Sequence, residues 1–184
     1  MTTPVILETA RLTLKPFDIS RHLTPRYVSW LNDPAVVRYS EQRHRSHSLE
    51  SCRAFVTGFK DGPSRLWAIE RTEDACHIGN IHADIDAANS LADVAILIGE
   101  REAWGQGFGL EAWNAVLGWL LNEAHIRKVV AGCMRDNQAM LRIIHASGMT
   151  DDGVRTGHYL LDGQPQDVIF CAVFGTIQPK SPAE

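Results

Sequence analysis

Trp104-Gly105-Gln106-Gly107-Phe108-Gly109-Leu110-Glu111 joins the two most strongly patterned segments of the 184-residue chain. The segment before it, residues 91–99, contains the run Val94-Ala95-Ile96-Leu97-Ile98, which is typical of a central strand covered on both faces. The segment after it, residues 110–124, repeats its apolar residues at helical spacing. Glycines between a buried strand and a helix let main-chain N–H groups turn inward, and the helix dipole adds partial positive charge. The stretch therefore predicts a binding site for a diphosphate.

The spacing of these glycines argues against two common nucleotide-binding motifs. A dinucleotide fingerprint, Gly-x-Gly-x-x-Gly, would need glycine at Leu110 or Ala112, and the loop stands in the middle of the chain instead of after a first strand. A Walker P-loop needs Gly-Lys-Ser/Thr, which the sequence lacks here. NAD and ATP are therefore not favoured. A glycine-rich turn without a ligand is the alternative, although Asn137, which opens the next helix after a strand, favours a binding role.

Periodicity and turn residues predict the remaining elements. Helices are expected over 20–32, 48–59, 110–124 and 137–147, and strands over 11–17, 66–71, 76–85, 91–99, 129–134, 154–161 and 168–174. Three strands in a meander lead into a β-α-β-α unit, and a hairpin around Asp162-Gly163 closes the sheet. This order indicates a mixed α/β sheet with helices on both faces.

Composition narrows the class of protein. With 45% hydrophobic and 22% charged residues, the chain reads as one domain over residues 1–175, followed by a flexible tail over 176–184. A net charge of −4 argues against a nucleic-acid partner, and no apolar run is long enough for a membrane span. The four cysteines are widely spaced, and His44 and His47 lack a third ligand nearby, so no metal is expected. With no signal peptide visible, we expect a soluble cytoplasmic protein.

The glycine loop, the strand before it and the helix from Asn137 to Gly148 together resemble the GNAT superfamily of acetyl-CoA-dependent N-acetyltransferases. The pyrophosphate loop of that superfamily reads Arg/Gln-x-x-Gly-x-Gly/Ala, and Gly107 and Gly109 take its two glycine places. Trp104 stands where Arg or Gln is usual, a departure common in the branch of ribosomal-protein N-terminal and bacterial amino-sugar acetyltransferases. The opening Leu7-Glu8-Thr9-Ala10-Arg11-Leu12 is similar to that branch as well.

The resemblance implies a fold and a cofactor site. It implies a mostly antiparallel, twisted sheet of about seven strands with helices on both faces. A V-shaped splay would separate the strand at 94–99 from the strand at 129–134, and acetyl-CoA would lie in that gap. Main-chain groups would hold the pyrophosphate and the pantetheine arm, and one side chain would bind the arm. The residues implied are Ile96, Leu97, Ile98, Gln106, Gly107, Phe108, Gly109, Leu110 and Asn137.

Transfer of acetyl to an amine needs a base for the ammonium proton, a donor for the carbonyl oxygen and a proton for the departing thiolate. The residues that supply this proton in related enzymes are absent, because Ile144 stands at the usual Tyr position and Met140 at the usual Ser position. The candidates for the base are His82, which is the first choice, Glu100 and His158.

The acceptor is expected to be a small-molecule amine or a peptide N-terminus. Arg38, Arg43 and Arg45 belong to a basic segment that would clamp the phosphates of a nucleotide-linked amino sugar, unless that segment is only a solvated linker. The α-amine of a protein N-terminus is the second acceptor class, and a non-catalytic acyl-CoA-binding module is the alternative to an enzyme. We expect a monomer or a homodimer, with no nucleic-acid or membrane partner.

Overall fold

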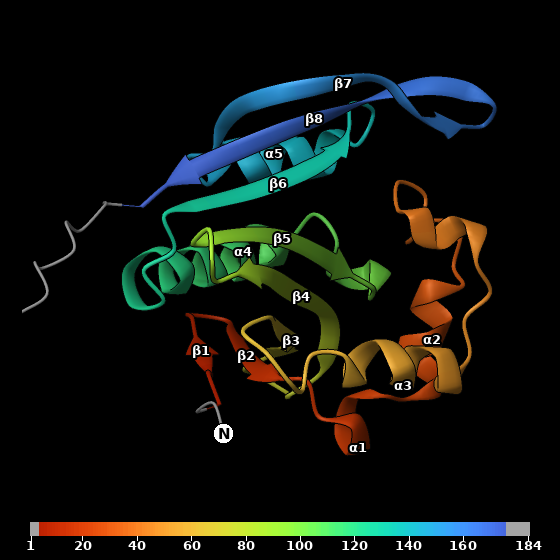
Figure 1. The fold of residues 1–184 in the computed structure, drawn as a ribbon. Coiled ribbons are helices and arrows are strands. Elements are labelled where there is room, and N and C mark those ends of the chain that lie inside the picture. The colour runs from red at the N-terminus through yellow and green to blue at the C-terminus, as the bar shows by residue number, and fades with distance from the viewer. Residues whose placement is uncertain (1–3, 176–184) are drawn as a thin grey trace, which may run out of the picture.

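The computed structural model describes residues 4–175, which form an eight-stranded sheet in the order β1-β2-β3-β4-β5-β6-β8-β7 (Figure 1). Within these residues, β5 and β6 are parallel and the other neighbouring strands are antiparallel. The strands are β1 Leu7–Glu8, β2 Leu12–Pro16, β3 Arg65–Arg71, β4 His77–Asp86, β5 Leu91–Ile98, β6 Lys128–Met134, β7 Thr150–Leu161 and β8 Gln164–Phe174. The predicted fold class is thereby confirmed.

The helices cover both faces of this sheet. The α-helices are α1 Ile19–His22, α2 Pro25–Leu31, α3 Leu49–Thr57, α4 Phe108–Gly118 and α5 Gln138–Ala146, and short helical turns lie at Glu41–His44, Arg101–Ala103 and Trp119–Glu123. Ile96 and Ile98 of β5 pack into the core that α4 and α5 bury. Leu97, whose side chain points the other way, packs against the smaller cluster around Tyr27 and Trp30 of α2. The central strand is therefore covered on both sides, as its apolar run predicts.

Two predicted segments differ most from the structure. The helix expected over 20–32 is two short helices, because Pro25 cannot donate an N–H and disfavours helical backbone at Thr24. Thr24 instead caps α2 by accepting a hydrogen bond from the N–H of Tyr27 at 3.3 Å. The closing hairpin is longer than predicted, since β7 begins at Thr150, where its residues are exposed and lack an apolar alternation. The tail expected over 176–184 lies outside the described residues.

The sheet opens between β5 and β6. These strands pair only at Leu91↔Lys128, Ala92↔Val129 and Asp93↔Val130, whereas β6 stays paired with β8 along its whole length. Figure 1 shows β5 and β6 diverging beyond this point. The predicted V-shaped splay is thus present, and one edge of β5 over residues 94–98 lacks a partner strand within the described chain.

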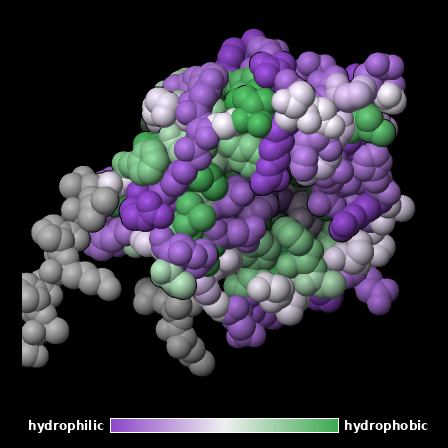
Figure 2. All heavy atoms as spheres, turned by 45° about the horizontal axis from the view of Figure 1, so that its top comes forward, coloured by the Kyte–Doolittle hydropathy of each residue, from purple (hydrophilic) through white to green (hydrophobic). Residues whose placement is uncertain are grey.

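The surface is mixed in character. Hydrophilic residues cover most of the face in Figure 2, and hydrophobic residues form separate groups, with a hollow near the centre of the view. Among residues 4–175, no helix is long and apolar enough to cross a lipid bilayer.

Candidate active site

The open edge of β5 presents main-chain groups to the splay. The N–H of Gly99 donates to the carbonyl of Ile78 at 3.0 Å, and the alternation of an antiparallel ladder then turns the main-chain groups of Leu97 toward β4. The groups of Ile96 and Ile98 face the gap toward β6. Of the three residues expected to pair with an extended ligand, two therefore offer their main chain to it. The carbonyl of Ile98 already accepts the indole N–H of Trp104 at 2.8 Å, which fixes Trp104 at the mouth of the gap.

The glycine loop leaves helix α4 without a side-chain cap. Gly107 occupies the N-cap position with φ of +83°, a conformation that glycine adopts without strain. The first bond of the helix runs from the N–H of Glu111 to the carbonyl of Gly107 at 3.1 Å. The N–H groups of Phe108, Gly109 and Leu110 make no hydrogen bond within residues 4–175. Three donors at a helix N-terminus are therefore available to an anionic ligand.

Arg11, just before β2, holds both ends of this loop. Its Nη1 donates to the carbonyl of Gln106 at 3.0 Å, and its Nε donates to the Glu111 carboxylate at 2.7 Å. The guanidinium also lies 4.6 Å from the centre of the Phe108 ring. Because Gly107 adopts the left-handed conformation, the Gln106 carbonyl lies off the axis of α4 and accepts from Arg11. The N–H of Leu110, four residues later, is not bonded to it and stays free for a ligand.

Glu111 completes this arrangement as an anchored carboxylate. Thr9 donates to its Oε1 at 2.7 Å, and the main-chain N–H of Arg11 donates to the same atom at 2.8 Å. Burial alone would raise the pKa of Glu111, but these hydrogen bonds and the Arg11 charge outweigh it and lower the pKa. The sequence predicts no role for Arg11, because its hydrogen-bond partners are about a hundred positions away and no local sequence pattern indicates these contacts.

Helix α5 approaches the loop closely. A Cβ atom on Gly109 would lie 3.0 Å from Cδ1 of Ile143, so a side chain at this position would require the Ile143 side chain to shift. Asn137 caps α5, since its side-chain oxygen accepts the N–H of Met140 at 3.2 Å. The amide NH₂ of Asn137 is the part that stays available to donate to a ligand.

Two substitutions separate these roles of Asn137. Asn137→Ser keeps a capping oxygen but loses the NH₂ donor, so coenzyme A binding should weaken while the melting temperature stays near that of the wild type. Asn137→Ala loses both, and its unfolding free energy should fall by about 1 kcal/mol. Calorimetric titration with coenzyme A and thermal denaturation measure the two effects. Equal coenzyme A affinity in wild type and Asn137→Ser would show that the side-chain amide of Asn137 does not bind coenzyme A.

His82 lies on β4, on the sheet face that α3 covers. Its ring packs edge-on against Phe55 and Phe59, at centroid distances of 6.2 and 5.7 Å. Its Nε2 lies 3.6 Å from the Asp84 carboxylate. Burial lowers the pKa of His82 although Asp84 opposes this, so the imidazole is neutral at neutral pH and able to accept a proton.

An acidic pair lies on the same face as His82. Asp84 on β4 and Asp93 on β5 are register partners, so their side chains are neighbours. Burial, with the charge of Asp84 beside it, raises the pKa of Asp93 to about 6. Asp93 is also the last β5 residue paired with β6, so this pair marks the point from which the splay opens. Sequence reasoning did not identify it, because the pairing depends on strand register.

The structure does not bring the other candidate bases into contact with His82. Glu100, beyond the far end of β5, forms an ion pair with Arg26, whose guanidinium lies 5.6 Å from the Trp30 ring. His158 is exposed on β7, and its ring lies 4.6 Å from that of Tyr159.

Two of the three arginines expected to bind substrate instead contact the tip of the β7–β8 hairpin. Arg38 pairs with Asp162 at 2.9 Å, and Arg43 donates to the carbonyl of Leu160 at 2.8 Å. Arg45 is exposed. The segment after α2 is therefore tied across to the hairpin, and the charges of Arg38 and Arg43 are partly used by the protein itself.

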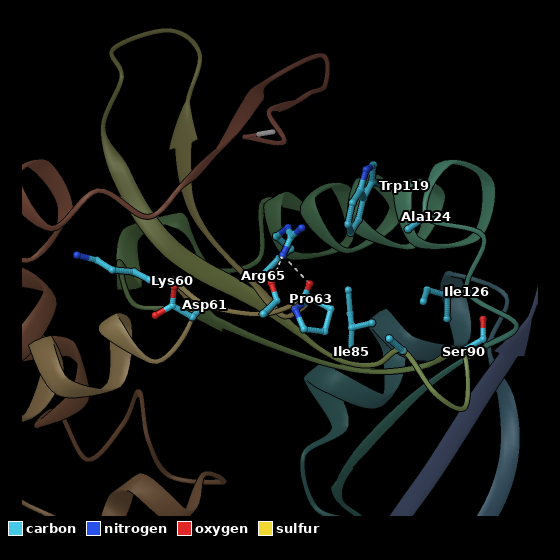
Figure 3. A pocket seen from close by; sticks show the side chains of 11 residues that line it. Lys60, Asp61, Pro63, Arg65, Ile85, Ser90, Trp119, Ala124 and Ile126 are labelled. Carbon is cyan, nitrogen blue, oxygen red and sulfur yellow. Dashed lines mark hydrogen bonds between the residues drawn. The ribbon is translucent and has the colours of Figure 1, made fainter. Parts of the chain in front are cut away.

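A separate hollow of about 710 Å³ lies between the loop before β3, the β4–β5 turn and the end of the helix that follows α4 (Figure 3). Arg65 folds back over its own loop there and donates to the carbonyl of Pro63 at 2.6 Å. Ile85 and Ser90 line this hollow at the end of β4 and β5 opposite to the glycine loop. It contains none of the predicted site residues.

A sheet opened beside its central strand, with an uncapped helix N-terminus at the mouth of the opening, defines an acyltransferase of the GNAT type. The acetyltransferase (GNAT) domain family matches residues 11–150, and the chain belongs to this family. It is accordingly an acetyltransferase, as the sequence predicts. No curated protein sequence matches the chain.

Solved structures with the same fold include three with informative descriptions. The ribosomal L7/L12 α-N-protein acetyltransferase RimL, in complex with coenzyme A, is 22% identical, and the match has a TM-score of 0.79 and covers 93% of this chain and 98% of RimL. A spermidine N-acetyltransferase from Vibrio cholerae, in complex with coenzyme A and spermine, is 18% identical, and the match has a TM-score of 0.80 and covers 91% of this chain and 98% of that enzyme. A ribosomal-protein-S5-alanine acetyltransferase from Vibrio fischeri is 15% identical, and the match has a TM-score of 0.80 and covers 94% of this chain and 97% of that enzyme.

Proposed function

We propose that this chain transfers the acetyl group of acetyl-CoA to a primary amine, by direct attack of the amine on the thioester. The observation that carries the proposal is the set of three N–H groups at residues 108–110, which are free of acceptors in the described chain and stand at the mouth of the splay. A carrier with linked phosphates suits the helix N-terminus, and its extended arm can pair with the open edge of β5.

The strand register supports His82 as the base. A carrier anchored at residues 107–110 and extended along β5 would bring its thioester toward the apex of the splay. His82 is the register partner of Ala95, beside that part of β5, whereas Glu100 belongs to the phosphate end. His82 would take the ammonium proton directly or through one water, and the N–H of Ile96 would stabilise the carbonyl oxygen as it becomes negative. Water would return a proton to the thiolate.

The acidic pair supports a cationic acceptor. Asp84 and Asp93 lie on the His82 face, where they would attract an ammonium group and orient it toward the splay. An amino sugar linked to a nucleotide, which the basic segment of the sequence favours, has less support because Arg38 and Arg43 bind the hairpin tip. Polyamines and the α-amine of a basic peptide both meet the requirement for positive charge.

A thiol-release assay tests the activity and the acceptor together. Purified protein with acetyl-CoA is offered a polyamine, a basic peptide with a free N-terminus and an amino sugar, and coenzyme A binding is measured in parallel by thermal shift. Release of thiol that depends on a cationic amine supports the proposal. Turnover of the amino sugar alone would overturn the acceptor assignment. Tight binding of coenzyme A without turnover of any amine would instead favour a non-catalytic binding module.

His82→Gln should lower kcat by about 10²- to 10⁴-fold, as expected for loss of a general base. In the wild type, kcat/KM should rise with pH through a pKa below the ordinary histidine value, because burial favours the neutral ring. This limb of the pH profile should disappear in the variant. His125→Asn, between α4 and β6, is the matched control and should keep both the rate and the profile. A His82→Gln enzyme with the wild-type profile would exclude His82 as the base.

A further inference from the structure

Three side chains that commonly bind metal ions meet at the end of α5. His145 comes from the last turn of α5, Asp151 from the beginning of β7 and Cys171 from β8. Their ligand atoms lie within 4.8 Å of one another. The Nε2 of His145 is 3.0 Å from Oδ1 of Asp151, and the Sγ of Cys171 is 3.5 Å from that oxygen and 3.8 Å from Nε2. Three separate elements thus contribute one nitrogen, one oxygen and one sulfur.

These separations match the geometry of bound zinc. Tetrahedral Zn²⁺ with bonds of about 2.3 Å to sulfur and about 2.0 Å to nitrogen and oxygen sets its ligands about 3.3 Å apart (N to O) and about 3.5 Å apart (O to S and N to S). Each observed distance differs from its counterpart by roughly 0.3 Å or less. The cluster would therefore accept the ion with little movement of the main chain, and a water molecule would complete four coordination.

Access and local chemistry also suit an ion. The side chains of His145 and Asp151 are 51% and 71% exposed, whereas Cys171 is fully buried beneath them. A cation would therefore reach the exposed side chains of His145 and Asp151 from solvent and then bind the buried thiol of Cys171. The Asp151 carboxylate offers one oxygen to both the thiol and the imidazole, and its negative charge would offset part of the cation's charge.

We propose that His145, Asp151 and Cys171 form a binding site for Zn²⁺. On binding, the Cys171 S–H bond breaks, its proton leaves to solvent and the thiolate binds the metal. His145 binds through the lone pair of Nε2 and carries its proton on Nδ1, and Asp151 binds as the carboxylate. Atoms and charge balance with release of one proton and no change in oxidation state. The bound ion would join the end of α5 to the β7–β8 hairpin.

Cobalt spectroscopy tests the site without any measurement of activity. Untagged full-length protein, reduced and freed of metal, is titrated with Co²⁺ and then with Zn²⁺. The expected result is one equivalent of Co²⁺ with a thiolate-to-cobalt charge-transfer band and the visible absorption of a tetrahedral ion, both abolished by one equivalent of Zn²⁺. Absence of stoichiometric binding, or binding without the charge-transfer band, would overturn the proposal.

Variants identify the ligands. Cys171→Ser should lose the charge-transfer band, and His145→Gln and Asp151→Asn, which are exposed and should fold normally, should each weaken Zn²⁺ binding at least about tenfold. Asp152→Asn on the same strand and Cys76→Ser elsewhere are the matched controls and should bind as the wild type does. Wild-type affinity in His145→Gln and Asp151→Asn, or equal weakening in the controls, would refute the assignment.

Discussion

Arg11→Ala is expected to weaken coenzyme A binding by about 10- to 100-fold, because the variant loses charge-assisted hydrogen bonds that shape the phosphate loop. Without the guanidinium, the Gln106 carbonyl loses the hydrogen bond that ties the loop to β2, so the N–H groups of residues 108–110 are held less firmly in place. The carboxylate of Glu111 also loses its ion-pair partner, although the Thr9 hydroxyl and the main-chain N–H of residue 11 still donate to it. Isothermal titration with coenzyme A measures the change in Kd.

Two further variants make this result specific. Glu111→Gln keeps the shape of the side chain but removes its charge, so it should show a smaller loss of affinity in the same direction. Arg53→Ala removes an arginine of α3 outside the loop and should bind coenzyme A as the wild type does. If Arg11→Ala kept the wild-type Kd, Arg11 would have no part in positioning the loop.

Glu70→Ala is expected to lower the free energy of unfolding by about 3 kcal/mol, the lower end of the range for breaking a buried ion pair. The Glu70 side chain is only 1% exposed and lies 2.7 Å from Arg21, 2.8 Å from Lys15 and 2.9 Å from His22. Lys15 and Arg21 are partly exposed and can regain water in the variant, which keeps the loss near the lower end. Urea denaturation at pH 7 measures the effect.

The pH dependence gives a second readout for Glu70. Burial alone would raise the pKa of Glu70, but hydrogen bonds from Lys15 and His22 and the charge of Arg21 outweigh it and lower the pKa. A carboxylate with a lowered folded-state pKa stabilises the fold above its unfolded-state pKa, and this stability is lost as the pH falls through the folded-state value. The difference between wild type and Glu70→Ala should therefore be constant near neutral pH and shrink below about pH 4.5. Glu73→Ala, in the exposed β3–β4 turn, should show neither effect.

Much of the fold could be predicted because its signals are local. The apolar run of β5, the helical spacing of α4 and the glycines between them reflect backbone sterics and burial within a few residues. Pro25 is also a local signal for the break between α1 and α2. The apolar residues on either side of it, however, are at helical spacing and predict one continuous helix. The first four residues of β7 gave no such signal, since they are exposed and are held by pairing with β8.

The sequence alone determined the family, the glycine loop and the strand that borders the splay. Each of these depends on one continuous segment, in which backbone sterics and the spacing of apolar residues decide the local structure. Only the tertiary structure decided which distant side chains meet. Arg11 reaches Glu111, Asp84 faces Asp93, Arg38 turns to Asp162 and His145 joins Asp151 and Cys171. The physical reason is that strand register and helix docking set these contacts, and a shift of one residue in register would separate every one that crosses the sheet.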